Sequence, residues 1–361
     1  MLFLSAQEIA DWSHLAEKAL QGDAAPGRYE NEIRPNLLSV FHYYIGAMLA
    51  AERQKERGID WLRAAARYEE GGPFSASHLL GFLERNGGEL IMPVVVFQDP
   101  RAFLHFTQNP IMKEGRRKFV AECVCSLPEF PKPFSMIDIG CGDGGLTVSF
   151  LQHLKETGKV REIAEILLID SSLAMVDLAK KTVSEAFPDL PITTECCRIQ
   201  DFSNRIDRHF DCAISSLAFH HMPYEEKLVH LSRLKPRIDH FILYEMDANN
   251  DTPELHSPEL ALAVYQSYGG IIDCIFSQDA PIDVVTVCVD SFLMTEVVSF
   301  FIHPRGVRTD YHMLQNQWHA LFTETFGSEF SLRCCSTCYS DRYTTLFMMH
   351  FGRVGRLQHE P

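Results

Sequence analysis

The chain has 361 residues, of which 46% are hydrophobic and 22% charged, an ordinary composition for a globular protein of one large or two medium domains. Its formal net charge of −15 argues against a function in binding nucleic acid or anionic membranes, because such binding needs clustered Lys and Arg. The densest basic stretch, residues 53–67, is interspersed with acidic side chains and predicts a mixed, solvated helix face.

The first residues predict no secretory signal, because polar and acidic side chains soon follow the apolar residues 1–4. We expect no membrane-spanning segment, which would need ~20 apolar residues. The eleven cysteines are scattered, so we expect reduced thiols in a cytoplasmic protein. Cys335 and Cys338 form a single C-x-x-C pair. Without a second pair, we expect ordinary strand residues there and no metal site.

Residues 1–127 predict a helical N-terminal domain. Helical patterns cover residues 38–49, 52–67, 75–85 and 113–127. The apolar residues 90–97 favour a strand, which Pro93 would confine to the edge of a sheet. Three interpretations stay open: a cap over a substrate pocket, a dimerisation domain that would make the protein a homodimer, and an extension that only completes the core.

Residues 134–361 predict a second domain, which follows the proline-rich linker at 128–133. Strands and helices alternate here, which favours an α/β fold with a parallel sheet and helices on both faces. Strands are expected at 136–139, 166–169, 192–196, 210–215, 241–245, 330–335 and 343–351. Helices are expected at 146–154, 172–187, 225–234 and 311–326. Residues 247–310 exceed a simple connection and predict an insertion, with helices at 260–268 and 292–301.

The joint between the first of these strands and its helix is rich in glycine. Gly140, Gly142 and Gly145 let the backbone turn tightly and let a ligand approach closely. The free N–H groups at the start of the following helix favour electron-rich ligand groups. The turn therefore predicts a cradle for a nucleotide cofactor.

Two cofactor classes compete for this turn. The three glycines match G-x-G-x-x-G, the fingerprint of dinucleotide-binding proteins. Asp138, two residues before Gly140, adds a second pattern, D-x-G-x-G. It resembles motif I of class I S-adenosylmethionine-dependent methyltransferases, in which the strand carboxylate helps to hold the loop and the amino-acid end of the cofactor. A dinucleotide enzyme needs no carboxylate there, because it has to accommodate a diphosphate.

The end of the second strand favours the methyltransferase interpretation. Asp170 ends this strand, where a carboxylate can accept the ribose hydroxyl protons of either cofactor class. The residues from Asp170 to Met175, Asp-Ser-Ser-Leu-Ala-Met, resemble the methyltransferase pattern D-x-S-x-x-M. A helix N-cap would explain Ser171 or Ser172 but not the conjunction of the two motifs. We therefore assign Asp170 and Ser171 to the cofactor site.

The resemblance implies further site residues after the third and fourth strands. Asp201 would take the adenine amino group and Phe202 would contact the ring, although Asp201 is also explained as a solvated loop residue. Ser215 and Ser216 would contact the cofactor. In the loop that follows, His220 or His221 would act as a general base, because imidazole titrates near neutral pH. The alternative is that the paired histidines only pack or orient the loop.

Two further groups of polar residues have weaker interpretations. Glu245 lies at the end of the fifth strand, where a substrate contact and a helix-capping role are equally plausible. His303, Arg305, Arg308 and His312 are able to grip a carboxylate, but the Pro304-Arg305-Gly306 sequence favours an exposed turn.

The resemblance covers residues 134–351 and implies a Rossmann-like, seven-stranded methyltransferase sheet whose last strand is antiparallel. We expect an S-adenosylmethionine-dependent methyltransferase that acts on a small molecule. The loop after the fourth strand lacks the N/D-P-P-Y sequence of amino-directed nucleic-acid methyltransferases. Two alternatives stay open: an NAD(P)-dependent oxidoreductase, and a non-catalytic regulatory or binding protein on a methyltransferase-like scaffold.

Overall fold

The computed structural model describes residues 2–69, 74–93 and 100–355. The chain forms two compact units. The sheet unit comprises residues 97–247, 313–340 and 345–361, and the helical unit comprises residues 1–96, 248–312 and 341–344. These units divide the chain differently from the expected domains 1–127 and 134–361, because the inserted segment joins the N-terminal helices in one unit.

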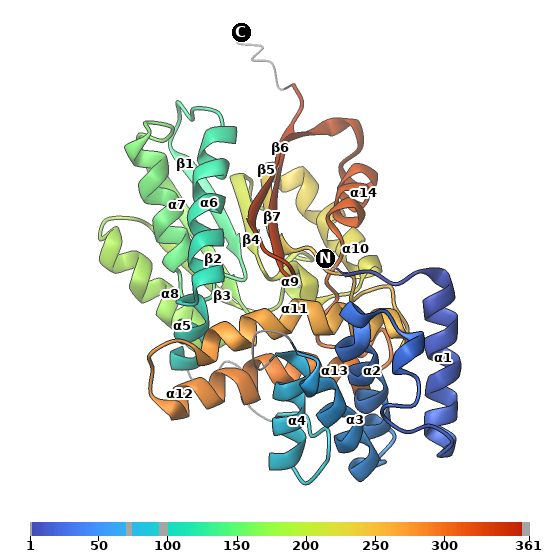
Figure 1. Cartoon of the computed structure of the whole chain (residues 1–361). Helices are drawn as coiled ribbons and strands as arrows, with labels where there is room; N and C mark the ends of the chain where they lie inside the picture. The colour runs from blue at the N-terminus through green and yellow to red at the C-terminus, as the bar shows by residue number, and fades with distance from the viewer. Residues whose placement is uncertain (1, 70–73, 94–99, 356–361) are drawn as a thin grey trace. The chain divides into compact units, whose positions relative to one another are not determined.

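The sheet unit is built on a seven-stranded sheet in the order β3-β2-β1-β4-β5-β7-β6 (Figure 1). The strands are β1 (Phe134–Ile139), β2 (Ile163–Asp170), β3 (Ile192–Cys196), β4 (Phe210–Ser216), β5 (Ile238–Met246), β6 (Phe330–Ser340) and β7 (Thr345–Arg353). Strands β1 to β5 are parallel, and β7 runs antiparallel to both of its neighbours. The expected α/β class and seven-stranded methyltransferase sheet are confirmed.

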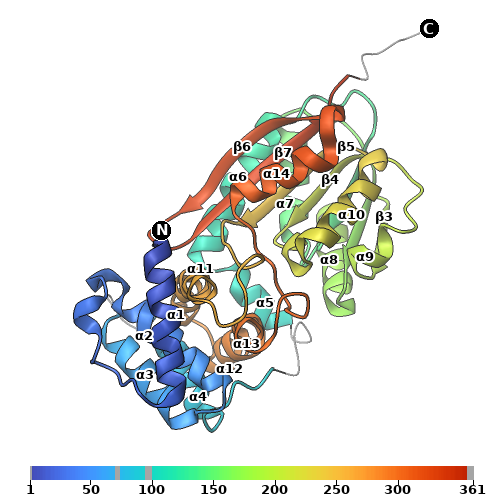
Figure 2. The same ribbon diagram turned by 90° about the vertical axis from the view of Figure 1, so that its right-hand side faces the viewer.

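Helices cover both faces of this sheet, as Figure 1 and Figure 2 show. One face carries α6 (Pro110–Ser126), α7 (Gly145–Glu156) and α8 (Leu173–Ala186). The other carries α9 (Ile199–Phe202), α10 (Tyr224–Leu234) and α14 (Gln315–Phe326). A continuous apolar core joins this second layer to the sheet, with Trp318 and Phe322 packed against strand residues such as Phe241. Because helices cover both faces, strands such as β1 are almost entirely buried.

Most expected elements in this unit lie within a few residues of the observed ones. Helix α5 (Pro100–Thr107) was not expected, because its eight residues are too few for a clear periodic pattern. The expected strand at 90–97 is absent from residues 90–93, and residues 94–97 lie outside the described part of the chain. The C-x-x-C pair lies on β6 as expected, and both of its cysteines are free.

The helical unit contains two groups of helices from distant parts of the sequence. The first group is α1 (Ala6–Gln21), α2 (Leu38–Ala51), α3 (Lys55–Arg67) and α4 (Ser75–Arg85). The second group, from the inserted segment, is α11 (Pro258–Phe276), α12 (Ile282–Val287) and α13 (Met294–Ile302). Helices α2 and α3 approach closely at Gly46 and Gly58, since a Cβ on Gly46 would lie 2.7 Å from Leu62 Cγ. The capping and dimerisation roles of this unit stay predictions.

The helical run Ile282–Ile302 departs from the expectation that no segment is long and apolar enough to span a membrane. Its most apolar window has a mean hydropathy of 1.8, so it passes that test by length and composition. However, 67% of the window is buried inside the structure. Core helices of globular proteins have the same property, because they are apolar on most sides.

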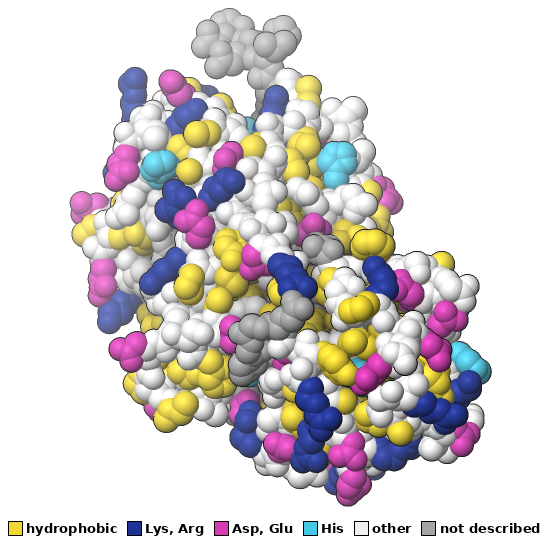
Figure 3. Space-filling view, in the orientation of Figure 1, with side chains coloured by type: hydrophobic (Ala, Val, Ile, Leu, Met, Phe, Trp, Pro, Cys, Tyr) yellow, Lys and Arg dark blue, Asp and Glu magenta, His cyan; other side chains and the backbone are white. Residues whose placement is uncertain are grey.

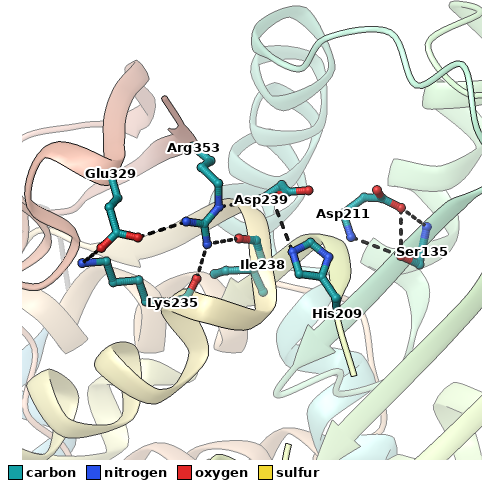
Figure 4. A network of polar contacts seen from close by, with 8 residues as sticks. All are labelled: Ser135, His209, Asp211, Lys235, Ile238, Asp239, Glu329 and Arg353. Carbon is teal, nitrogen blue, oxygen red and sulfur yellow. Dashed lines mark hydrogen bonds and ion pairs between the residues drawn. The ribbon is translucent and has the colours of Figure 1, made fainter. Parts of the chain in front are cut away.

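A polar network lies at the amino ends of the parallel strands (Figure 4). The glycine-rich turn lies at their carboxyl ends, because it follows β1. Arg353 of β7 donates to the backbone oxygens of Lys235 and Ile238 at 2.6 and 3.0 Å. Its guanidinium also contacts Asp239, at 3.2 Å, and Glu329, at 3.1 Å. Because these contacts join β7 to the start of β5, Arg353 fixes the antiparallel strand in its register.

We expect Arg353→Ala to lower the free energy of unfolding by about 1 to 2 kcal/mol, because charged hydrogen bonds to backbone groups are lost. Thermal unfolding of the purified protein measures the effect. The matched control is Arg117→Ala, which removes an exposed i,i+3 ion pair with Glu114 and should change little. Equal effects of the two substitutions would show that the network contributes no more than a surface pair.

Candidate functional site

The glycine-rich turn after β1 needs glycine at three positions. Gly140, Gly142 and Gly144 have φ angles of +77°, +52° and +74°, in the left-handed region that favours glycine. A Cβ on Gly144 would lie 2.9 Å from the Cα atom of Ala179 in α8. Gly145, which completes the dinucleotide fingerprint, is instead the first residue of α7 and has no positive φ. The third glycine that the turn requires is therefore Gly144.

Side chains from two other segments approach this turn. A Cβ on Gly142 would lie 2.8 Å from Cζ of Phe103, which belongs to α5. A Cβ on Gly140 would collide with Ala218 in the loop after β4. The turn thus lies between α5 and the loop after β4. Both segments can approach it closely because Gly140 and Gly142 have no side chains.

Asp170 connects the turn to the start of α8. Its carboxylate accepts from the Gly142 N–H at 3.1 Å and from the Ser172 N–H at 2.9 Å. Burial raises the pKa of Asp170, and these two hydrogen bonds and the nearby His221 oppose that shift. A carboxylate has about four lone-pair positions, so Asp170 keeps capacity to accept from a hydroxyl group. This geometry fits the predicted ribose contact.

Asp138 is buried next to the same turn, with 4% of its surface exposed. The hydroxyl of Thr147 in α7 donates a hydrogen bond to its carboxylate, so Asp138 joins β1 to the helix across the glycines. Burial raises the pKa of Asp138 to about 6, and the Thr147 hydrogen bond lowers it only in part. The predicted role in holding the loop has a geometric basis, and the contact with the cofactor's amino-acid end stays a prediction.

The residues assigned to the adenine and ribose have different surroundings. Ser171 is exposed, and it is Ser172 that caps α8 by accepting from the Met175 N–H at 3.4 Å. Asp201 is exposed on α9 and pairs with Arg198 at 3.5 Å. Phe202 is buried in the apolar core of the sheet unit. The structure therefore shows a helix-end carboxylate and a core aromatic, and their cofactor contacts stay predictions.

Strand β4 ends beside the glycine-rich turn, because Ser215 lies opposite Ile139 in the register of the sheet. Ser215 is fully buried, and its Oγ has no hydrogen-bond partner within the described part of the chain. Ser216 is half-buried at the end of the strand. Leu217 then adopts a φ of +50°, unusual for a branched residue, and its N–H donates to the Tyr244 oxygen at 2.8 Å. The chain thus bends sharply next to the predicted cofactor site.

The two histidines of the β4 loop differ in environment. His220 is 5% exposed, and its Nδ1 lies 2.8 Å from Oε2 of the fully buried Glu245 on β5. His221 is exposed, and its ring centroid lies 4.3 Å from that of His220. Glu245 was predicted as a substrate or capping residue, and its pairing with His220 was missed. The signal that could have found the pairing is the adjacency of β4 and β5, since Glu245 lies near the carboxyl end of β5 and His220 follows β4.

A search of protein-family models places this site in a known domain. The model described as "Methyltransferase domain" matches residues 136–236. Residues 136–236 are a methyltransferase domain. The domain runs from β1 to the end of α10 and contains every predicted cofactor-binding residue as well as His220 and His221. Its family uses S-adenosylmethionine.

Solved structures that match the chain include three of low identity. One is magnesium protoporphyrin IX methyltransferase from Synechocystis PCC 6803 with bound SAH, at 15% identity, 70% coverage of this chain, 93% of that chain and a TM-score of 0.41. The cyclopropane synthase MmaA2 from Mycobacterium tuberculosis is 10% identical, with 71% of this chain and 95% of that chain covered and a TM-score of 0.43. An S-adenosylmethionine-dependent methyltransferase from Clostridium acetobutylicum ATCC 824 is 11% identical, with 70% of this chain and 98% of that chain covered and a TM-score of 0.41. These scores are too low to carry an argument, and no curated protein matches the chain.

The methyltransferase domain has groups suited to S-adenosylmethionine. Asp170 keeps lone pairs for the ribose hydroxyls, the glycine turn has no side chain where a ligand would approach, and the buried Ser215 hydroxyl has an unused hydrogen-bonding capacity. These residues would hold the cofactor at the carboxyl ends of β1, β2 and β4.

We expect Asp170→Ala to weaken the binding of S-adenosylhomocysteine by more than tenfold, or about 1.4 kcal/mol, because a hydroxyl acceptor is lost and the Gly142 loop is released. Isothermal titration calorimetry measures the affinity, and circular dichroism checks that the variant is folded. Asp177→Ala, an exposed change on the same α8 helix, is the control. Unchanged affinity in Asp170→Ala would remove this residue from the site.

We expect Asp138→Asn to alter the pH dependence of stability. The folded-state pKa is raised from 3.8 to about 6, so the folded protein holds a proton that the unfolded chain releases between these values. The contribution of Asp138 to stability therefore falls as pH rises from about 4 to 6, by about 2 to 3 kcal/mol. Urea unfolding without cofactor should show the variant gaining stability relative to wild type between pH 4 and pH 7. A constant difference would contradict the raised pKa.

Proposed function

We propose that the chain is an S-adenosylmethionine-dependent methyltransferase that acts on a small-molecule acceptor. The observation that carries the proposal is the glycine turn, which lies between the buried Asp138 and the carboxylate of Asp170 inside a methyltransferase domain. When bound, S-adenosylmethionine supplies a methyl group on a positively charged sulfur for in-line displacement by the acceptor. The residues around the turn bind and orient, and such positioning supplies much of the rate in a transfer of this kind.

The charge of the chain supports a small acceptor rather than a nucleic acid. On the face shown in Figure 3, Lys and Arg side chains alternate with Asp and Glu. The net charge is −15, and phosphate backbones need clusters of positive charge. After β4 the chain continues Leu217-Ala218-Phe219, without the proline-rich motif of amino-directed nucleic-acid methyltransferases. We propose no nucleic-acid partner and no membrane partner.

His220 is the proposed general base. Its Nδ1 contact with Glu245 fixes the orientation of the ring. A proton from the acceptor would be taken at Nε2, at the other edge of the ring. Where the acceptor atom carries no proton, His220 would instead only orient the loop.

The proposal extends to location. All eleven cysteines are free, as expected of a protein in a reducing compartment, so we propose a cytoplasmic enzyme.

The first experiment is calorimetric titration of the full-length protein with S-adenosylhomocysteine, with NADH in a parallel cell. Micromolar binding of S-adenosylhomocysteine alone supports the proposal. Binding of NADH alone would replace it with a dinucleotide enzyme, and binding of neither would favour a non-catalytic scaffold.

Transfer of a radiolabelled methyl group to a panel of small acceptors then tests catalysis. With an acceptor whose reacting atom carries a proton, His220→Ala should lower turnover by about 100-fold or more and leave cofactor affinity nearly unchanged. Glu245→Gln should shift the pH profile of turnover, because a neutral amide supports the imidazolium less. The control is His319→Ala, which removes an exposed histidine on α14. Full turnover in His220→Ala would show that this histidine is not the base.

A further inference from the structure

Three potential metal ligands converge within the helical unit. They are Glu296 on α13, and Asp310 and His312 in the segment that follows it. One ligand atom from each lies within 4.8 Å of the other two. Asp310 is fully buried and His312 is 2% exposed, so this is no ordinary group of solvated surface charges.

We propose that Glu296, Asp310 and His312 bind a divalent transition-metal ion. None of the three ligands is a residue that we assign to the cofactor or to the general base.

The chemistry of the three donors selects the class of ion. A cation that binds between two carboxylate oxygens held close together relieves their mutual repulsion. An imidazole nitrogen alongside them suits Zn²⁺, Mn²⁺, Fe²⁺ or Co²⁺ better than Mg²⁺ or Ca²⁺, which prefer oxygen donors throughout. Three protein ligands would leave coordination positions for water or for a small anion.

The segment that supplies two of the ligands is held rigidly. The His312 carbonyl oxygen accepts from the N–H groups of Asn250 and Asp251 at 2.9 and 3.0 Å. Arg308, 4% exposed, donates to the carbonyl oxygens of Asn250 and Pro253 at 3.0 and 2.9 Å. Such anchoring fixes the ligand positions before an ion binds, which reduces the entropy lost on binding.

An exposed turn lies at Pro304-Arg305-Gly306, as expected, with Pro304 and Gly306 exposed. Arg308 is buried, and Arg305 pairs with the buried Asp251 at 2.8 Å. Both arginines stabilise the segment that carries the ligands.

A second set of contacts surrounds the cluster, as is usual for metal sites. The Tyr268 hydroxyl donates to Oε2 of Glu296 at 2.6 Å, and its ring lies edge-on to His312 with centroids 6.4 Å apart. This contact orients the Glu296 carboxylate.

Asn250, bonded through its backbone to His312, is a further polar group beside the cluster. It is fully buried, and neither atom of its side-chain amide has a partner within the described residues. An amide oxygen is a suitable additional donor to a divalent ion.

The test uses full-length protein that has been stripped with a chelator and dialysed. Titration with Co²⁺ should give one site per chain, with visible ligand-field absorption and a Kd in the micromolar range or below. Calorimetry with Zn²⁺ should give the same stoichiometry. Glu296→Gln and His312→Ala should each weaken binding by at least 100-fold, and Tyr268→Phe by about 10-fold to 100-fold.

The matched control is His14→Ala, which removes an exposed histidine and should leave binding unchanged. Circular dichroism of the metal-free variants shows whether each has folded, and Glu296→Gln preserves the shape of the side chain. Absence of Co²⁺ and Zn²⁺ binding by wild type would overturn the proposal. So would one-site binding that survives in folded Glu296→Gln and His312→Ala, because the ion would then lie elsewhere.

Discussion

The hydrogen bond from the Gly142 N–H to the Asp170 carboxylate is the contact on which the geometry of the predicted cofactor site depends. It joins the turn after β1 to the end of β2, and the same carboxylate continues to the N–H of Ser172 at the start of α8. The turn can adopt this path only because its glycines tolerate positive φ. The conformation of the turn, the pairing of β1 with β2 and the predicted ribose contact therefore all involve the Asp170 side chain.

Much of this region was predictable because its signals are local. Short windows of sequence contain the glycines, the apolar runs that form buried strands, and the aspartates near the ends of strands. Local patterns also placed α8, which begins with an N-capping serine, within a residue or two of its observed bounds. The identity of the third glycine was less accessible, since the need for Gly144 arises from Ala179, a residue 35 positions later in α8.

The remaining features depend on contacts between distant parts of the chain. His220 and Glu245 are paired because β4 and β5 are neighbours, and no pattern within either segment reveals the contact. The Glu296 and His312 cluster likewise requires the fold of a segment that shows no regular structure between residues 303 and 314. Helix α5 was missed for the opposite reason, since eight residues hold too little periodicity. The membrane-like composition of Ile282–Ile302 shows that apolarity by itself does not separate a core helix from a spanning one.

The division of the chain into units has a consequence for biosynthesis. The helical unit takes its parts from residues 1–96, 248–312 and 341–344, and the sheet unit takes its parts from the stretches between and after them. A ribosome therefore finishes neither unit before it reaches residue 344. Helix α2, whose apolar sides are covered partly by α11 and α13, must wait for about 200 residues of synthesis before its partners emerge. During that interval the nascent chain exposes an apolar helix, which is a natural binding site for a chaperone.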